Sequence, residues 1–113
     1  MYAEVLTSID QAMPPALELL IMALCADYTR REQVIAEGRA NYSIIMEYRF
    51  LNYRIFRAAS EIAGPADAKV FINEIGSGVG YATSSLFRMS ERIYKRRKQQ
   101  IKFNIAKQLC LYE

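Results

Sequence analysis

Length and composition restrict the classes to which this chain of 113 residues can belong. With 52% hydrophobic residues it is expected to fold as one domain, residues 1–113, whose core needs no disulfide or metal to stabilise it. The sequence lacks histidine, the commonest general base and metal ligand, and its cysteines, Cys25 and Cys110, are far apart, so no enzyme, cofactor or metal site is expected.

The first predicted helix begins at Pro14-Pro15 and ends near Gly38. Proline is tolerated in a first helical turn, and glycine readily adopts the left-handed conformation that ends many helices. Between them, apolar residues recur at helical spacing: Leu17, Leu20, Ile21, Leu24, Tyr28 and Ile35. The most apolar stretch, residues 16–26, is about half as long as a membrane span. Because no signal-peptide pattern precedes it, we expect a cytoplasmic protein with no membrane partner.

A second predicted helix runs from Asn41, a favourable capping residue, to Gly64-Pro65. Its apolar seam repeats in steps of three and four residues: Ile44, Tyr48, Leu51, Ile55, Ala58, Ala59 and Ile62. Alternation around residues 48–55 would also suit a strand, but the helical repeat covers more of the chain.

Arginines and aromatic residues interleave along this second helix, at Arg49, Phe50, Tyr53, Arg54, Phe56 and Arg57. Such a pattern could stack on the bases of single-stranded nucleic acid. The favoured interpretation is an amphipathic helix whose arginines lie over their aromatic neighbours.

A third helix is predicted from a cap at Asp67 through Ile75, and a short strand over residues 69–75 is the alternative. Gly76, Gly78 and Gly80 then interrupt the pattern. They do not match a dinucleotide-binding loop, because Tyr81 stands where a third glycine would be required. A hinge or turn before the last part of the chain is the favoured interpretation.

The last part of the chain, residues 76–113, is predicted to form a helix-turn-helix unit after a helical N-terminal part, residues 1–75. A short helix over residues 84–88 and a turn precede Ser90, which can cap a final helix running to about Leu109. Ile93 and Ile101 are expected to face the body of the domain. The chain is thus predicted to be all-α, with about five helices and a C-terminal helix-turn-helix.

Positive charge is concentrated on this final helix. Residues 1–87 contain seven basic and ten acidic residues, a net charge of −3, whereas residues 88–113 contain eight basic and two acidic residues, a net charge of +6. A basic surface with so little compensating acid is typical of a polyanion-binding protein, and nucleic acid is the commonest such partner. RNA, a membrane surface and a plain solvated face are the alternatives. The residues expected to contact DNA are Ser90, Arg92, Lys95, Arg96, Lys98, Gln99 and Lys102, with Arg92 and Arg96 reading bases.

Residues in this region match a known pattern. Gly80-Tyr81, Leu86, Met89-Ser90, Ile93-Tyr94 and Arg97 resemble the helix-turn-helix of sigma-70 region 4. Residues 81–111 are similar to the sigma-like late-gene regulators of phages and prophages of Gram-positive bacteria, of the RinA and ArpU kind. The matching segments are residues 89–98 and 105–109, and residues 28–32 and 48–54 resemble the N-terminal helices of those proteins more loosely.

This resemblance implies a DNA-binding transcriptional regulator of phage or prophage genes. The last helix would read promoter DNA, and the acidic N-terminal part would contact RNA polymerase or a second copy of the chain. The candidate partners are therefore double-stranded DNA, RNA polymerase and the chain itself. Two other interpretations stay open: a phage DNA-packaging subunit similar to a small terminase, and a helical adaptor whose basic face meets an acidic protein.

Overall fold

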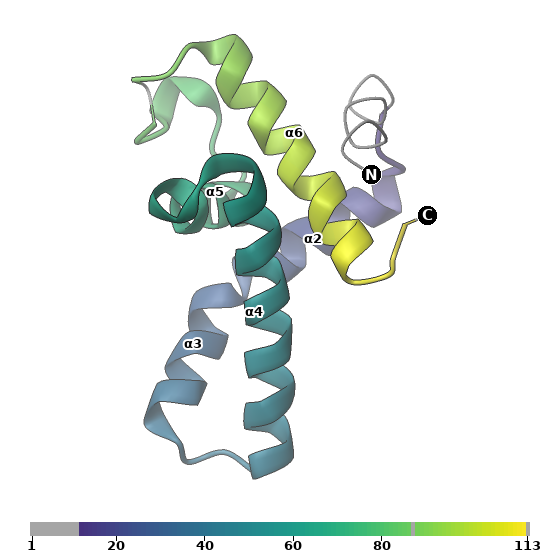
Figure 1. Ribbon diagram of the computed structural model, residues 1–113, viewed down its shortest axis with the longest axis vertical. Helices are drawn as coiled ribbons and strands as arrows, with labels where there is room; N and C mark the ends of the chain where they lie inside the picture. The colour runs from purple at the N-terminus through teal and green to yellow at the C-terminus, as the bar shows by residue number, and fades with distance from the viewer. Residues whose placement is uncertain (1–11, 87, 113) are drawn as a thin grey trace.

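The computed structural model describes residues 12–86 and 88–112. All regular secondary structure in these residues is helical, and none of them forms a strand. In chain order the elements are α2 (Pro15–Ala26), α3 (Tyr28–Glu37), α4 (Tyr42–Ala63), α5 (Pro65–Ser77), the single 3-10 turn η1 (Tyr81–Thr83) and α6 (Glu91–Gln108) (Figure 1). The predicted all-α class is confirmed. Helix was also the correct choice for residues 48–55 and 69–75, where strands were the alternative.

The helices form a packed body from which one hairpin projects. α3 and α4 run antiparallel and extend from the body, whereas the C-terminal half of α4 packs against α5 and α6 (Figure 1). α2 closes the core by contacting both α5 and α6. The core therefore joins residues far apart in the sequence, among them Ile21, Ile55, Phe71, Ile75 and Ile101.

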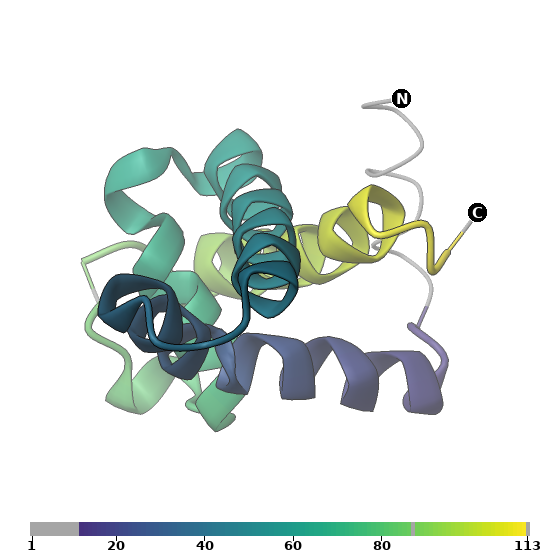
Figure 2. The ribbon, with the colours of Figure 1, turned by 90° about the horizontal axis from the view of Figure 1, so that it is seen from below.

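The first predicted helix is not continuous. It bends at Asp27, where α2 ends and α3 begins, and Figure 2 shows α3 nearly end-on while α2 runs across the view. The buried Arg31 guanidinium stabilises the bend by donating to the Leu24 carbonyl at 2.5 Å and to Asn52 Oδ1 of α4 at 2.6 Å. Because the charged guanidinium donates to a backbone carbonyl at the bend, the break between α2 and α3 costs little folding free energy.

α4 forms as its sequence predicts. The Asn41 side chain accepts a hydrogen bond from Ser43 N at 2.8 Å and caps the helix, which ends at Gly64. Ile55, Ala58 and Ala59 of the predicted seam are fully buried. Ile44, at the projecting end of the hairpin, is 42% exposed, because the apolar seam of α4 extends there beyond the helices of the body.

α5 begins at Pro65, so the predicted cap at Asp67 is wrong and Asp67 lies within the first turn. Proline suits this position because its missing N–H would have had no partner inside the helix. Gly76 belongs to α5 and is required for close packing: a Cβ on it would lie 2.5 Å from Ala26 N and 2.6 Å from Ala26 Cα. The hinge expected at Gly76 is thus a tight contact with the α2–α3 bend.

The short helix predicted over residues 84–88 is also wrong for the described residues 84–86 and 88. Between η1 and α6, Ser84 has an extended backbone, and residues 85, 86 and 88 form turns. The Ser84 hydroxyl accepts from Leu86 N at 2.9 Å and donates to Glu74, and the Ser85 hydroxyl also donates to Glu74. Serine side chains that bond in this way compete with helix formation. The structure accordingly does not confirm a C-terminal helix-turn-helix.

Candidate nucleic-acid interface

α6 carries the predicted DNA-contacting residues, and one of its faces is anchored to the body. Its N-cap forms as predicted: Ser90 Oγ accepts a hydrogen bond from Ile93 N at 3.2 Å. One turn into the helix, the buried Tyr94 ring stacks on Phe71 of α5, with ring centroids 5.5 Å apart, and meets Tyr81 at the same distance. The first turns of α6 are therefore held rigidly against α5 and the loop before α6.

A buried carboxylate organises this loop. Glu74 Oε1 accepts from Ser84 Oγ at 2.6 Å and from Tyr94 Oη at 2.8 Å. Its other oxygen, Oε2, accepts from the backbone N–H and the hydroxyl of Ser85, both at 3.1 Å. Tyr81 Oη closes the loop by donating to the Met89 carbonyl at 2.7 Å. These contacts fix the position from which α6 leaves the loop.

The same network shifts the acidity of its members. Burial raises the pKa of the Glu74 carboxyl, but the hydrogen bonds from Ser84, Tyr94 and Ser85 together outweigh burial and hold that pKa below its ordinary value of 4.5. Burial, aided by the hydrogen bond to Glu74, raises the pKa of Tyr94 to about 12. The folded protein thus favours an ionised Glu74 beside a neutral Tyr94.

The pKa of Glu74 predicts an acid limit to stability. Because the folded state lowers this pKa, Glu74 contributes stability that is present above about pH 4.5 and is lost as the pH falls through its folded pKa. Glu74→Gln should lower the free energy of unfolding by about 1–3 kcal/mol at pH 7, because buried donors lose a charged acceptor. Urea denaturation at pH 7 and pH 3 should show this difference shrinking at the lower pH. The exposed Glu37→Gln is the matched control, and a difference independent of pH would contradict the prediction.

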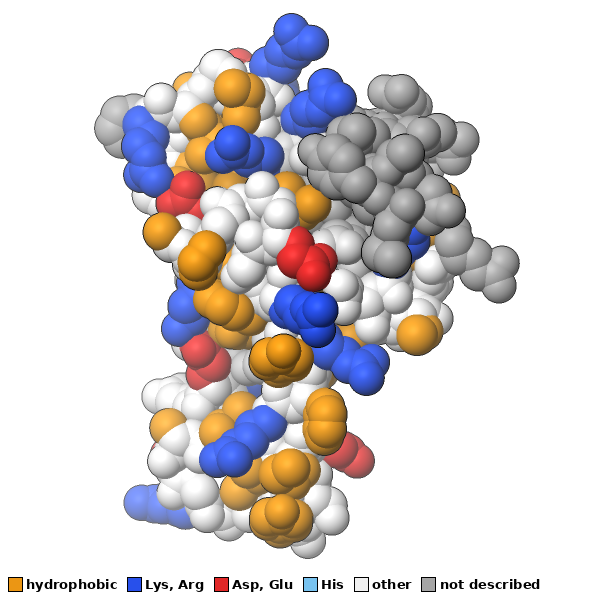
Figure 3. Space-filling model, viewed as in Figure 1, with side chains coloured by type: hydrophobic (Ala, Val, Ile, Leu, Met, Phe, Trp, Pro, Cys, Tyr) orange, Lys and Arg blue, Asp and Glu red, His pale blue; other side chains and the backbone are white. Residues whose placement is uncertain are grey.

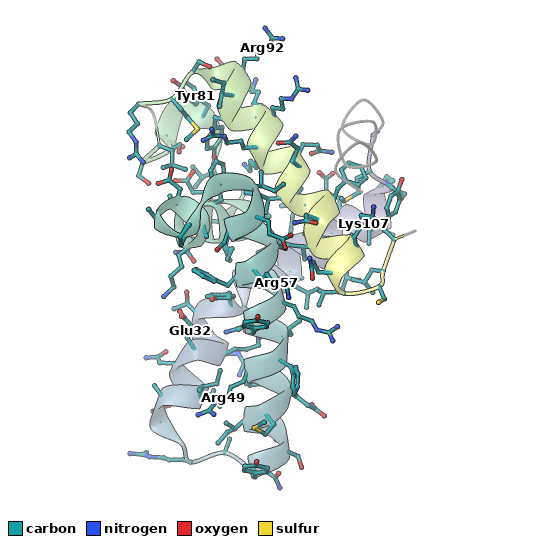
Figure 4. The ribbon with its side chains drawn as sticks, viewed as in Figure 1. Glu32, Arg49, Arg57, Tyr81, Arg92 and Lys107 are labelled. Carbon is teal, nitrogen blue, oxygen red and sulfur yellow. The ribbon has the colours of Figure 1, made fainter. Side chains whose placement is uncertain are left out.

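The predicted DNA-contacting residues divide into two groups. Arg92, Lys95 and Arg96 are exposed in the first two turns of α6, and Arg97 is partly exposed beside them. These four residues are called here the basic end of α6. In Figure 4, Arg92 points away from the body at the N-terminal end of α6. Within the described chain, Lys95 pairs with Glu91 at 2.7 Å, whereas Arg92, Arg96 and Arg97 form no ion pair.

The second group is engaged within the protein. Lys98 Nζ donates to the Val79 carbonyl at 2.6 Å and lies over the Tyr94 ring. Lys102 Nζ pairs with Glu18 of α2 at 2.8 Å, and its side chain is only 13% exposed. Gln99 lies between the two groups and is partly exposed. Lys98 and Lys102 therefore connect α6 to the loop and to α2, and their charges are less available to a ligand.

Sequence reasoning misplaced Ile93 and overlooked Glu74. Ile101 is buried as predicted, but Ile93 is 45% exposed, because the face of α6 that packs against the body is the one that carries Tyr94, seven residues before Ile101. Ile93 adds an apolar contact surface beside the basic end. Glu74 was detectable as a lone acid among Phe71, Ile72 and Ile75, although the sequence does not say which donors it meets.

Two open grooves flank the α3–α4 hairpin. One, of about 560 Å³, lies between the first half of α4 and Leu109. The other, of about 340 Å³, lies between α3 and the opposite side of α4 and includes Glu32 and Arg49.

Across the described residues, histidine, cysteine and carboxylate side chains gather nowhere in a group that could hold a metal ion. Likewise, none of the described helices combines the length and apolarity that a membrane crossing requires.

Comparisons of the chain with protein-family models, with curated proteins and with solved structures find no match.

Proposed function

We propose that this protein binds double-stranded DNA through the basic end of α6. The observation that carries the proposal is the exposure of Arg92 and Arg96, with Arg97 partly exposed beside them. None of the three has an acidic partner in the described chain, and the opposite face of the helix is anchored. Unpaired arginines on a rigid element are suited to a phosphate backbone and to guanine edges.

The geometry of α6 suits the major groove, which is wide enough to admit an α-helix. Arg92 and Arg96 lie one turn apart on one face in the first turns, where recognition helices make their base contacts. In place of the short helix predicted before α6, the turns over residues 84–86 and 88–90 would lie beside the DNA backbone. Arg88 of these turns is 65% exposed and pairs at 2.8 Å with Asp67, whose side chain is only 17% exposed, so a DNA phosphate would have to replace a partly buried carboxylate as its partner.

The regulatory role follows from the resemblance to sigma-like phage regulators. In that proposal α6 reads promoter DNA, RNA polymerase is the further partner, and phage or prophage genes are controlled. A DNA-packaging subunit would also bind duplex DNA, but it would not change transcription from a promoter carrying the selected site. Transcription measured in vitro with and without the protein separates these two roles.

The salt dependence of binding tests the DNA proposal. Each phosphate that the protein neutralises lowers log K by about 0.9 per decade of salt, so four contacts from the basic end predict a slope steeper than about −3. Fluorescence anisotropy with a labelled duplex at several salt concentrations measures it. Arg97→Ala should make the slope shallower by about 0.9, whereas Arg39→Ala, between α3 and α4, should leave it unchanged. Binding that does not respond to salt would exclude this mode of recognition.

A further inference from the structure

The exposed side of α4 carries large apolar side chains that no described part of the chain covers. Tyr42, Phe50 and Tyr53 are 76%, 60% and 61% exposed. Figure 3 shows hydrophobic side chains gathered along the lower part of the molecule, over α4. Contiguous exposed apolar surface of this kind marks interaction sites in proteins that otherwise keep such groups apart.

This surface includes the larger groove, of about 560 Å³. Tyr42, Met46, Phe50 and Leu51 of α4 line it, together with Leu109 just after α6. Its charged lining residues are Glu47 and Arg54, one acid and one base. In the part of the chain that the structure describes, Glu47 is exposed and takes part in no ion pair, and Arg54 donates only a long hydrogen bond, 3.4 Å, to the Gln108 carbonyl. The groove is thus apolar, with one available charge of each sign.

The two charges are arranged symmetrically about the midpoint between Phe50 and Leu51. Glu47 and Arg54 are seven residues apart on α4, which is about two helical turns or 10 Å along the axis, so they lie on nearly the same face. The midpoint between them falls between Phe50 and Leu51. A second α4 that runs antiparallel across this midpoint would place its Arg54 opposite Glu47 and its Glu47 opposite Arg54. A two-fold interface requires this kind of self-complementarity.

We propose that the groove binds a second copy of this chain, with the two α4 helices antiparallel and the Phe50 side chains packed at the two-fold axis. The hairpin projects from the body, so a second hairpin can lie along it (Figure 1). The basic end of α6 lies at the opposite end of the molecule and stays uncovered. The dimer therefore does not depend on the proposed DNA binding, and either can fail without the other.

A single-stranded nucleic acid fits this surface less well, although its arginines and aromatic residues could suit base stacking. Glu47 would repel phosphates within the groove, and Arg57 pairs with Glu61 at 3.4 Å. With the charge of Arg54 offset by Glu47, the groove has no excess positive charge, and an electrostatic attraction for a strand is missing.

Charge exchange across the groove tests the dimer. Sedimentation equilibrium of the full chain should give twice its 13.0 kDa mass at micromolar concentration. Glu47→Arg alone and Arg54→Glu alone each place like charges opposite one another, so each should weaken self-association at least tenfold. An equimolar mixture of these two variants restores both opposite-charge pairs and should again give the doubled mass. The double variant Glu47→Arg/Arg54→Glu should also dimerise.

Controls keep the result interpretable. Glu37→Arg, an equal charge change at the end of α3, should leave the dimer intact. Circular dichroism should show that every variant retains its helix content, so loss of the doubled mass reports on association. A monomeric wild type at all concentrations, or single variants that dimerise as well as wild type, would overturn the proposal. So would a monomer that binds a labelled single-stranded oligonucleotide and loses that binding on Phe50→Ala.

Discussion

Replacement of Ile55 by alanine should lower the free energy of unfolding by about 2–5 kcal/mol. Ile55 is fully buried in the part of α4 that packs against α5 and α6. Truncation removes apolar atoms from the core and leaves a cavity, and the surrounding helices, anchored at several points, can close it only in part. Because the chain contains no tryptophan, urea denaturation followed by circular dichroism is the suitable measurement.

Ile44→Ala is the matched control for this change. Ile44 belongs to the same helix and the same predicted seam, but it is 42% exposed near the end of the hairpin. Its truncation should cost less than about 1 kcal/mol, since surface substitutions rarely cost more. Equal losses at the two positions would mean that the core is not centred where α4 meets α5 and α6.

Replacement of both Arg92 and Arg96 by alanine should remove most of the preference for a selected DNA site. A bidentate contact between arginine and guanine discriminates against the wrong base by about 1–3 kcal/mol, so the two together should account for roughly 30-fold or more. Affinity for a scrambled duplex should fall much less, because it depends on phosphate contacts. Anisotropy titrations with the selected and scrambled duplexes compare the two losses. Equal losses on both would make the basic end an electrostatic anchor and not a reader of bases.

Lys102→Ala provides the contrast within α6. On its position in the sequence, this residue was expected to touch phosphate, so that its loss would modestly weaken binding to all DNA. Its ion pair with Glu18 and its low exposure lead us to expect instead a loss of stability with little change in affinity. A salt slope that becomes shallower by about 0.9 in this variant would restore Lys102 to the interface.

Local rules explain what the sequence predicted correctly. Asn41 and Ser90 cap α4 and α6, and Gly64-Pro65 ends α4, because a cap or a break depends on residues within about one helical turn. The burial of Ile55 and Ile101 also follows from local periodicity, which fixes the faces of a helix. The charge of α6, which suggests the proposed ligand, can be read from the order of residues in the sequence alone.

Contacts between distant segments decided the rest. The bend at Asp27 depends on Arg31 reaching Asn52 of α4, and the turns at residues 84–86 depend on a carboxylate ten residues earlier. Two lysines of α6 are less available to a ligand because of residues far from them in the sequence. Glu18 of α2 pairs with Lys102, and the Val79 carbonyl accepts a hydrogen bond from Lys98. Propensity and spacing describe a segment and its near neighbours, whereas these features depend on which buried donor meets which acceptor after the helices have packed. The exposure of Ile93 has the same origin, because the contacts of Tyr94 with Phe71 and Tyr81 decide which face of the first turn of α6 packs against the body.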